Sequence, residues 1–164
     1  MTDYTHLSLW HEGLREDLTP RPGLGPAERS SHWDVIIMGA GYTGLWTALS
    51  LVEQSPTTTV LILEKEIAGF GASGRNGGWV SALFPASTNA LIHRHGVPPA
   101  TAMRQAMVAC VPSVGAWASK LDIDCDFVQG GTTSLVRADI HRQRAQSALQ
   151  EASMTPVDTL EWRD

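Results

Sequence analysis

The sequence predicts an α/β fold organised around one parallel β-α-β unit, and three observations support this. Residues 35–38 form a short unbroken apolar run, which is typical of a strand buried on both faces of a parallel sheet. Residues 39–44 carry glycine at their first, third and last positions and lead into a helical apolar face. A second apolar run at 59–63 ends in the acidic Glu64.

The glycine turn between the first strand and the helix is the most specific feature. Gly39 permits a tight turn, Gly41 lets a phosphate approach the backbone, and Gly44 lets the helix pack closely on the strand. The unpaired N–H groups at the helix start, around Tyr42 and Thr43, favour a pyrophosphate.

Glu64 follows the second strand, where a carboxylate is able to accept hydrogen bonds from the two hydroxyls of an adenosine ribose. Strand, glycine turn, helix, strand and acid together predict a dinucleotide site. A glycine-rich surface turn in a purely structural β-α-β unit is the alternative.

Composition narrows the function classes. The chain has 164 residues with a net charge of −5, which suits one modest globular domain without a basic face for nucleic acid. It has no apolar window of about twenty residues for a membrane span, and the first residues lack a signal-peptide pattern, so we expect a cytoplasmic protein. Cys110 and Cys125 are expected to be reduced, partly buried thiols.

Residues 1–33 are expected to form an irregular N-terminal arm, because prolines and glycines crowd positions 20–26. Apolar residues such as Trp10 and Trp33 need packing partners, which predicts that the arm lies across a folded body. A disordered leader is the alternative.

A second glycine-rich stretch covers residues 69–78, in which five of ten residues are glycine. This implies backbone at unusual φ or pressed against a ligand. Ser73 is able to cap a helix start, and Arg75 is able to bind a phosphate through its forked guanidinium. A flexible surface loop is the alternative. An NAD-binding module is disfavoured, because in such modules an ordinary crossover helix usually follows the acidic residue, and here a glycine-rich stretch follows it.

Residues 34–44, the pair Glu64-Lys65 and the run Gly-Phe-Gly-Ala-Ser-Gly-Arg-Asn-Gly-Gly-Trp at 69–79 resemble FAD-dependent oxidoreductases of the D-amino-acid oxidase superfamily. The most similar branch contains γ-glutamylputrescine and other amine oxidoreductases. The resemblance covers their amino-terminal portion, continuing through residues 81–85 and more weakly to about residue 150. It implies oxidation of a small-molecule amine or amino acid at its C–N bond, by hydride transfer to the flavin.

The resemblance also implies a partial Rossmann-like FAD-binding unit at 34–85. In the family the glycine turn binds the FAD pyrophosphate, the acid binds the ribose, and the Arg-Asn-Gly-Gly segment runs beside the pyrophosphate and flavin. The implied cofactor-binding residues are Gly39, Gly41, Tyr42, Thr43, Gly44, Glu64, Lys65, Ser73, Arg75, Asn76, Gly77 and Gly78. Since residues 69–80 contain no His or Cys, FAD is expected to be noncovalent, at least through this loop. No catalytic residue is identified.

Residues 86–122 predict a helical segment, with a short helix at 88–95 and a longer one opened by Pro98 and Pro99. Apolar residues recur along the longer helix from Met103 to Leu121, which favours core packing over a substrate cavity. Pro112 is expected to kink it.

Residues 123–164 are interpreted as the truncated beginning of a substrate domain. The β-like runs 123–128 and 132–138 flank a Gly-Gly pair and predict a hairpin, which the resemblance assigns to an antiparallel sheet over the flavin. A polar helix is expected at 139–152. The six histidines are scattered without a ligand cluster, so no metal site is predicted.

An open nucleotide-binding sheet normally has more parallel strands than two. We therefore expect the chain to be the front part of a larger enzyme, inactive by itself and poorly stable because apolar faces stay exposed. The alternative is a truncated, non-catalytic remnant that binds adenine nucleotide weakly or only packs against a partner.

Overall fold

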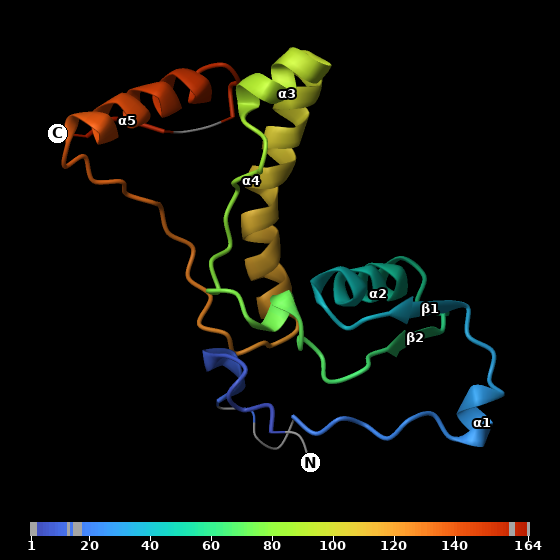
Figure 1. The fold of residues 1–164 in the computed structure, drawn as a ribbon. Helices are drawn as coiled ribbons and strands as arrows, with labels where there is room; N and C mark the ends of the chain where they lie inside the picture. The colour runs from blue at the N-terminus through green and yellow to red at the C-terminus, as the bar shows by residue number, and fades with distance from the viewer. Residues whose placement is uncertain (1–2, 13, 15–17, 158–159, 164) are drawn as a thin grey trace. The chain divides into compact units, whose positions relative to one another are not determined.

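The computed structural model describes residues 3–12, 14, 18–157 and 160–163. The chain divides into two compact units, Met1–Gly78 and Trp79–Asp164 (Figure 1). The first contains η1 (Leu9–His11), α1 (Pro26–Arg29), β1 (Val35–Met38), α2 (Tyr42–Gln54), β2 (Val60–Leu63) and η2 (Ala72–Gly74). The second contains α3 (Thr88–His95), α4 (Val97–Lys120) and α5 (Asp139–Ala152).

The first unit is built on a two-stranded parallel sheet. β1 and β2 pair with Val35 opposite Val60 and Met38 opposite Leu63, and α2 connects them and packs on both (Figure 1). The N–H of Gly39 donates to the carbonyl of Leu63 at 2.7 Å, so the pairing extends into the glycine turn. The predicted α/β fold with a partial Rossmann-like unit is confirmed in this part of the chain.

Gly44 lies where α2 meets the end of β1. It is buried, and a Cβ built on it would lie 2.1 Å from the Gly39 carbonyl oxygen and 3.2 Å from Cγ2 of Ile37. No side chain fits at the first of these distances, so the helix start approaches the strand this closely only because residue 44 is glycine. This is the packing role that the sequence predicted.

The prediction that β1 is buried on both faces is wrong for this structure. Val35 and Ile37 are half-buried, whereas the alternating residues Ile36 and Met38 are 55% and 89% exposed. Side chains of a strand alternate between the two faces of a sheet, and α2 covers only one of them. The exposed apolar face that we expected of a two-stranded sheet is therefore present.

In the second unit, α3 and α4 form a packed helix pair. Ser87 caps α3 by accepting the Ala90 N–H at 3.1 Å, and Gly96, with φ of 85°, separates the two helices. α5 contacts α3, and the Glu151 carboxylate accepts the N–H of Thr88 at the start of α3. The three helices match the predicted ranges closely.

The apolar stripe of α4 is only partly covered. Met107, Val114 and Trp117 are half-buried, but Met103 and Leu121 are 38% and 47% exposed. The stripe therefore packs less fully than core packing predicts. Pro112 lies inside this helix of 24 residues. None of the described helices has both the length and the apolarity needed to cross a membrane.

Cys110 and Cys125 are free and exposed. The prediction of partly buried thiols is therefore wrong. Cys110 lies on α4, whose stripe is only partly covered, and Cys125 lies in the irregular segment that follows the helix.

The hairpin predicted for residues 123–138 is not formed, since this fully described segment contains no strand. Val128 and Leu135 are 86% and 76% exposed. Two short β-like runs are marginally stable without further strands. Phe127 packs against Gly115 of α4, but no strand of the described chain pairs with either run. The antiparallel sheet is therefore absent from the described chain.

We predict that Gly44→Ala destabilises the first unit by about 3 kcal/mol, because overpacking forces backbone movement and the added Cβ meets a carbonyl oxygen. Urea unfolding followed by circular dichroism measures this change. Gly23→Ala is the matched control, since a Cβ there has no neighbour within 4 Å. Equal stability of the two variants would contradict the tight helix–strand contact.

Candidate functional site

The start of α2 presents unpaired backbone donors. Gly41 precedes the helix with extended backbone and offers no side-chain cap of its own. The N–H groups of Thr43 and Gly44 lie in the first helical turn, where intrahelical partners are lacking. The N–H of Tyr42 donates to Oγ of Ser73 at 2.9 Å. This helix start therefore suits an anionic group, with the positive end of the helix dipole behind it.

The Glu64 carboxylate lies at the same glycine turn. Its Oε2 accepts the Ala40 N–H at 2.8 Å and its Oε1 accepts the Glu66 N–H at 3.0 Å. These hydrogen bonds lower the pKa of the Glu64 carboxyl below its ordinary value, and the bond from the Ala40 N–H has the largest effect. The side chain is exposed, and each carboxylate oxygen has a further lone pair for a hydroxyl donor.

The glycine-rich loop folds back on itself beside this turn. The Gly69 N–H donates to the Ala40 carbonyl at 2.9 Å, and a Cβ on Gly74 would lie 2.2 Å from the Gly69 carbonyl oxygen. Gly69 and Gly78 have φ of 74° and 73°, which confirms the unusual backbone predicted from the glycine content. Gly77 is not at positive φ, and a Cβ on it would meet no protein atom within 4 Å.

Asn76 joins the loop to the first residue of α2. Its Nδ2 donates to the Tyr42 hydroxyl at 3.0 Å and to the Ser73 carbonyl at 2.6 Å. Its Oδ1 accepts the Gly78 N–H at 2.7 Å. Together with the Ser73 cap on Tyr42, these bonds hold the loop against the helix start.

Arg75 and Lys65 are placed differently from the other predicted residues. Arg75 donates from Nε to the Phe70 carbonyl at 2.8 Å, and its guanidinium carbon lies 4.8 Å from the centre of the Phe70 ring. Lys65 is exposed, with Nζ 3.9 Å from a carboxylate oxygen of Glu66. No hydrogen bond within the described residues joins either side chain to α2.

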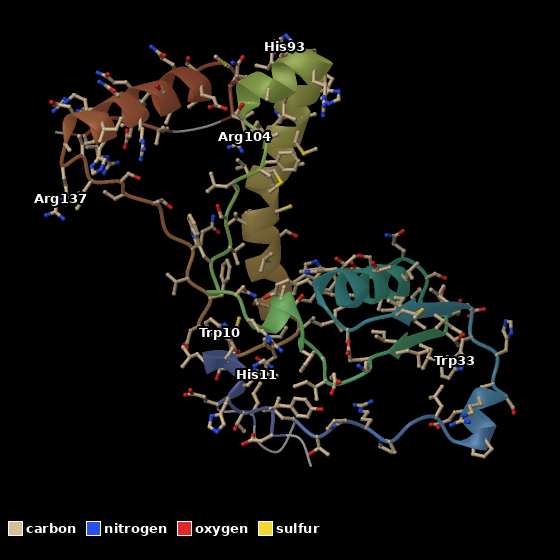
Figure 2. The ribbon with its side chains drawn as sticks, in the orientation of Figure 1. Trp10, His11, Trp33, His93, Arg104 and Arg137 are labelled. Atoms are coloured by element: carbon tan, nitrogen blue, oxygen red, sulfur yellow. The ribbon has the colours of Figure 1, made fainter. Side chains whose placement is uncertain are left out.

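The sequence did not indicate that the N-terminal arm contacts this loop. Ser8 Oγ donates to the Gly74 carbonyl at 2.6 Å, and Nε1 of Trp10 donates to the Asn76 carbonyl at 2.7 Å. Figure 2 shows Trp10 and His11 on the short helix η1. The one available signal was the apolar content of the arm, from which we expected it to lie across a folded body.

Ten of the twelve predicted residues fall into two groups, and Gly77 and Gly78 continue the loop after Asn76. The glycine turn, the start of α2 and the glycine-rich loop come together at one place. The predicted residues found there are Gly39, Gly41, Tyr42, Thr43, Gly44, Glu64, Ser73 and Asn76. Arg75 is held within its own loop, and Lys65 projects to solvent. In the described part of the chain, no cluster of three or more His, Cys, Asp or Glu is placed to hold a metal ion.

Comparison with known protein families matches residues 34–164 to the family described as FAD dependent oxidoreductase. The gamma-glutamylputrescine oxidoreductase of Escherichia coli K12 is 35% identical over 98 residues, covering 60% of this chain and 22% of that protein. The probable oxidoreductase OrdL of Haemophilus influenzae is 32% identical over 108 residues, covering 66% of this chain and 25% of that protein.

The sarcosine oxidase subunit beta of Rhizobium meliloti is 40% identical over 73 residues, which cover 44% of this chain and 18% of that subunit. The matched segments thus span no more than 25% of the length of these three relatives. No solved structure matches the chain.

We predict that Glu64 stabilises the turn only while it is ionised. Its pKa in the folded state lies below the ordinary value of 4.5, so the unfolded chain binds the proton first as pH falls. The stability that Glu64 contributes is therefore lost as pH falls through the pKa of the folded state. The stability difference between wild type and Glu64→Gln should be full at neutral pH and shrink below pH 4.5. Urea unfolding at a series of pH values measures it, and a pH-independent difference would contradict this account.

Proposed function

The chain belongs to the family of FAD-dependent oxidoreductases, and we propose that it is the amino-terminal, FAD-binding part of an enzyme that oxidises an amine or amino acid. The observation that carries the proposal is the meeting of the helix start, Glu64 and the glycine-rich loop at one turn. The names of two relatives support the substrate class, since gamma-glutamylputrescine and sarcosine are both amines.

The residues at this turn fit the two polar parts of an adenine dinucleotide. The unpaired N–H groups of the first turn of α2 would hold the pyrophosphate, and the lack of a side chain at Gly41 would let it approach the backbone. The exposed carboxylate of Glu64 would accept hydrogen bonds from the ribose hydroxyls, and its lowered pKa keeps it ionised for this task.

The glycine-rich loop would border the cofactor beyond the pyrophosphate. Ser73 and Asn76 are held beside the helix start by their bonds to Tyr42, and Gly77 and Gly78 follow directly along the chain. Arg75 and Lys65 would add positive charge around the phosphates without a fixed contact. We propose noncovalent binding, at least through this loop, because no His or Cys lies between residues 69 and 80.

FAD would supply the acceptor for a hydride that leaves the carbon of the substrate C–N bond, and the resulting imine would hydrolyse in water. The part of the protein described by this structure binds and orients the cofactor, and we assign no catalytic residue to it. We propose that the substrate is a small molecule, that residues 123–164 begin the substrate domain, and that the enzyme works in the cytoplasm. By itself the 164-residue chain is expected to be inactive.

A non-catalytic remnant is the second candidate. It is favoured by the open face of the sheet, where Ile36 and Met38 are exposed. Such a chain would bind adenine nucleotide weakly or serve only to pack against a partner. The two candidates differ in their affinity for FAD.

We predict that the purified chain binds FAD in preference to NAD, because the loop after Glu64 replaces the crossover helix of an ordinary NAD-binding unit. Separate titrations with FAD and NAD, followed by fluorescence, compare the two dissociation constants. A yellow protein with a flavin absorption band would agree with the proposal. A colourless protein with no measurable FAD affinity would favour the remnant.

Gly41→Val is predicted to abolish FAD binding while helix content persists. The side chain would occupy the place of the pyrophosphate contact, and already its Cβ would lie 3.1 Å from Oγ of Ser73. FAD titration and far-UV circular dichroism measure the two properties. Gly23→Val, at a position with open space around it, is the control. Unchanged FAD affinity in Gly41→Val would count against the site.

A further inference from the structure

We propose that residues 4–11 of the N-terminal arm hold the glycine-rich loop in the conformation that binds the cofactor, and that Trp10 is the principal positioning residue. This inference rests on the proposed FAD site and concerns residues outside it. The segment 4–11, called the clamp below, contacts the loop through hydrogen bonds and through side chains that fill the space over two glycines.

Three side chains of the clamp bond to the loop region. Trp10 Nε1 donates to the Asn76 carbonyl at 2.7 Å, and Ser8 Oγ donates to the Gly74 carbonyl at 2.6 Å. The Tyr4 hydroxyl donates to Oε2 of Glu66 at 2.8 Å. Tyr4 is buried, and its ring packs edge-on against Phe70 with centroids 6.1 Å apart.

The clamp also fits the glycines sterically. A Cβ on Gly78 would lie 2.7 Å from the Trp10 ring, and one on Gly74 would lie 2.9 Å from Cε1 of His11. His11 is buried, and its Nδ1 lies 2.7 Å from Oγ of Ser8. Thus two glycines of the loop leave room for clamp side chains, in addition to the positive φ of Gly78 and the close Gly69 carbonyl at Gly74.

The clamp is connected to the helix start through one residue. The Asn76 carbonyl binds Trp10, whereas the Asn76 side chain binds the Tyr42 hydroxyl and the Ser73 carbonyl. Ser73 in turn caps the Tyr42 N–H. Trp10 therefore acts on the proposed phosphate site through Asn76 and does not itself contact α2 through any described hydrogen bond.

A loop so rich in glycine has a large conformational entropy to lose when it is ordered. No strand pairs with residues 69–78, and their one regular element is the three-residue η2. External contacts must therefore supply the order, and the clamp supplies hydrogen bonds at Gly74 and Asn76, near the middle and the end of the loop. The cofactor would then meet a loop already in place.

Trp10→Ala and Trp10→Phe test this in the full chain. Trp10→Ala removes the donor and the ring, and we expect FAD affinity to fall about tenfold, whereas Trp10→Phe keeps a ring without the donor and should lose about threefold. In the absence of FAD, amide hydrogen exchange in residues 69–78 should accelerate in Trp10→Ala, while β1 and α2 keep their protection. Leu9→Ala is the control, since Leu9 is 70% exposed on the same helix.

A double variant tests whether Trp10 acts on FAD affinity through its contact with Gly78, where φ of 73° makes Gly78→Ala costly by itself. Gly78→Ala places a methyl group against the Trp10 ring, so Trp10→Ala should cost FAD affinity in the wild type and little or nothing in the Gly78→Ala background. Additive losses would overturn the direct contact.

The outcomes distinguish this inference from the proposed function. If wild type binds FAD and Trp10→Ala binds it equally well, the clamp is overturned even where exchange is faster. If wild type does not bind FAD, the proposed function fails, and exchange in residues 69–78 decides whether the clamp orders the loop. Unchanged exchange would then overturn it, and accelerated exchange would support the ordering role.

Discussion

The close approach of α2 to β1 at Gly44 is the constraint on which the first unit depends. Because the helix start lies against the Gly39 carbonyl, the intervening Ala40 is buried and its two backbone groups face fixed partners. Its N–H binds the Glu64 carboxylate and its carbonyl binds the Gly69 N–H. One residue of the turn thereby joins the end of β2 and the start of the glycine-rich loop.

The resulting site consists largely of backbone groups. Backbone donors are positioned by the conformation of the chain. The sequence must therefore provide glycine where two segments approach closely, as at Gly44, and where φ is positive, as at Gly78. Side chains contribute mainly by holding these segments together. Asn76 and Ser73 do so within the loop, and Trp10 does so from the arm.

Much of this arrangement follows from local patterns in the sequence. Apolar runs and periodic stripes locate the two strands and the helices, and the position of Glu64 after β2 places its carboxylate at the turn because parallel strands end at the same edge. The contact between Trp10 and Asn76 joins residues 66 positions apart and leaves no periodic signal. The runs at 123–138 show the opposite case, since β-like composition forms no strand where no partner strand lies beside it.

The two exposed thiols have a practical consequence for studies of this protein. Cys110 and Cys125 both belong to the second unit, and the sequence contains no other cysteine. A maleimide fluorophore or spin label therefore attaches to the helical unit and leaves the turn, Glu64 and the glycine-rich loop chemically untouched. The same accessibility allows chains to cross-link through intermolecular disulfides in air, so samples require a reducing agent before labelling.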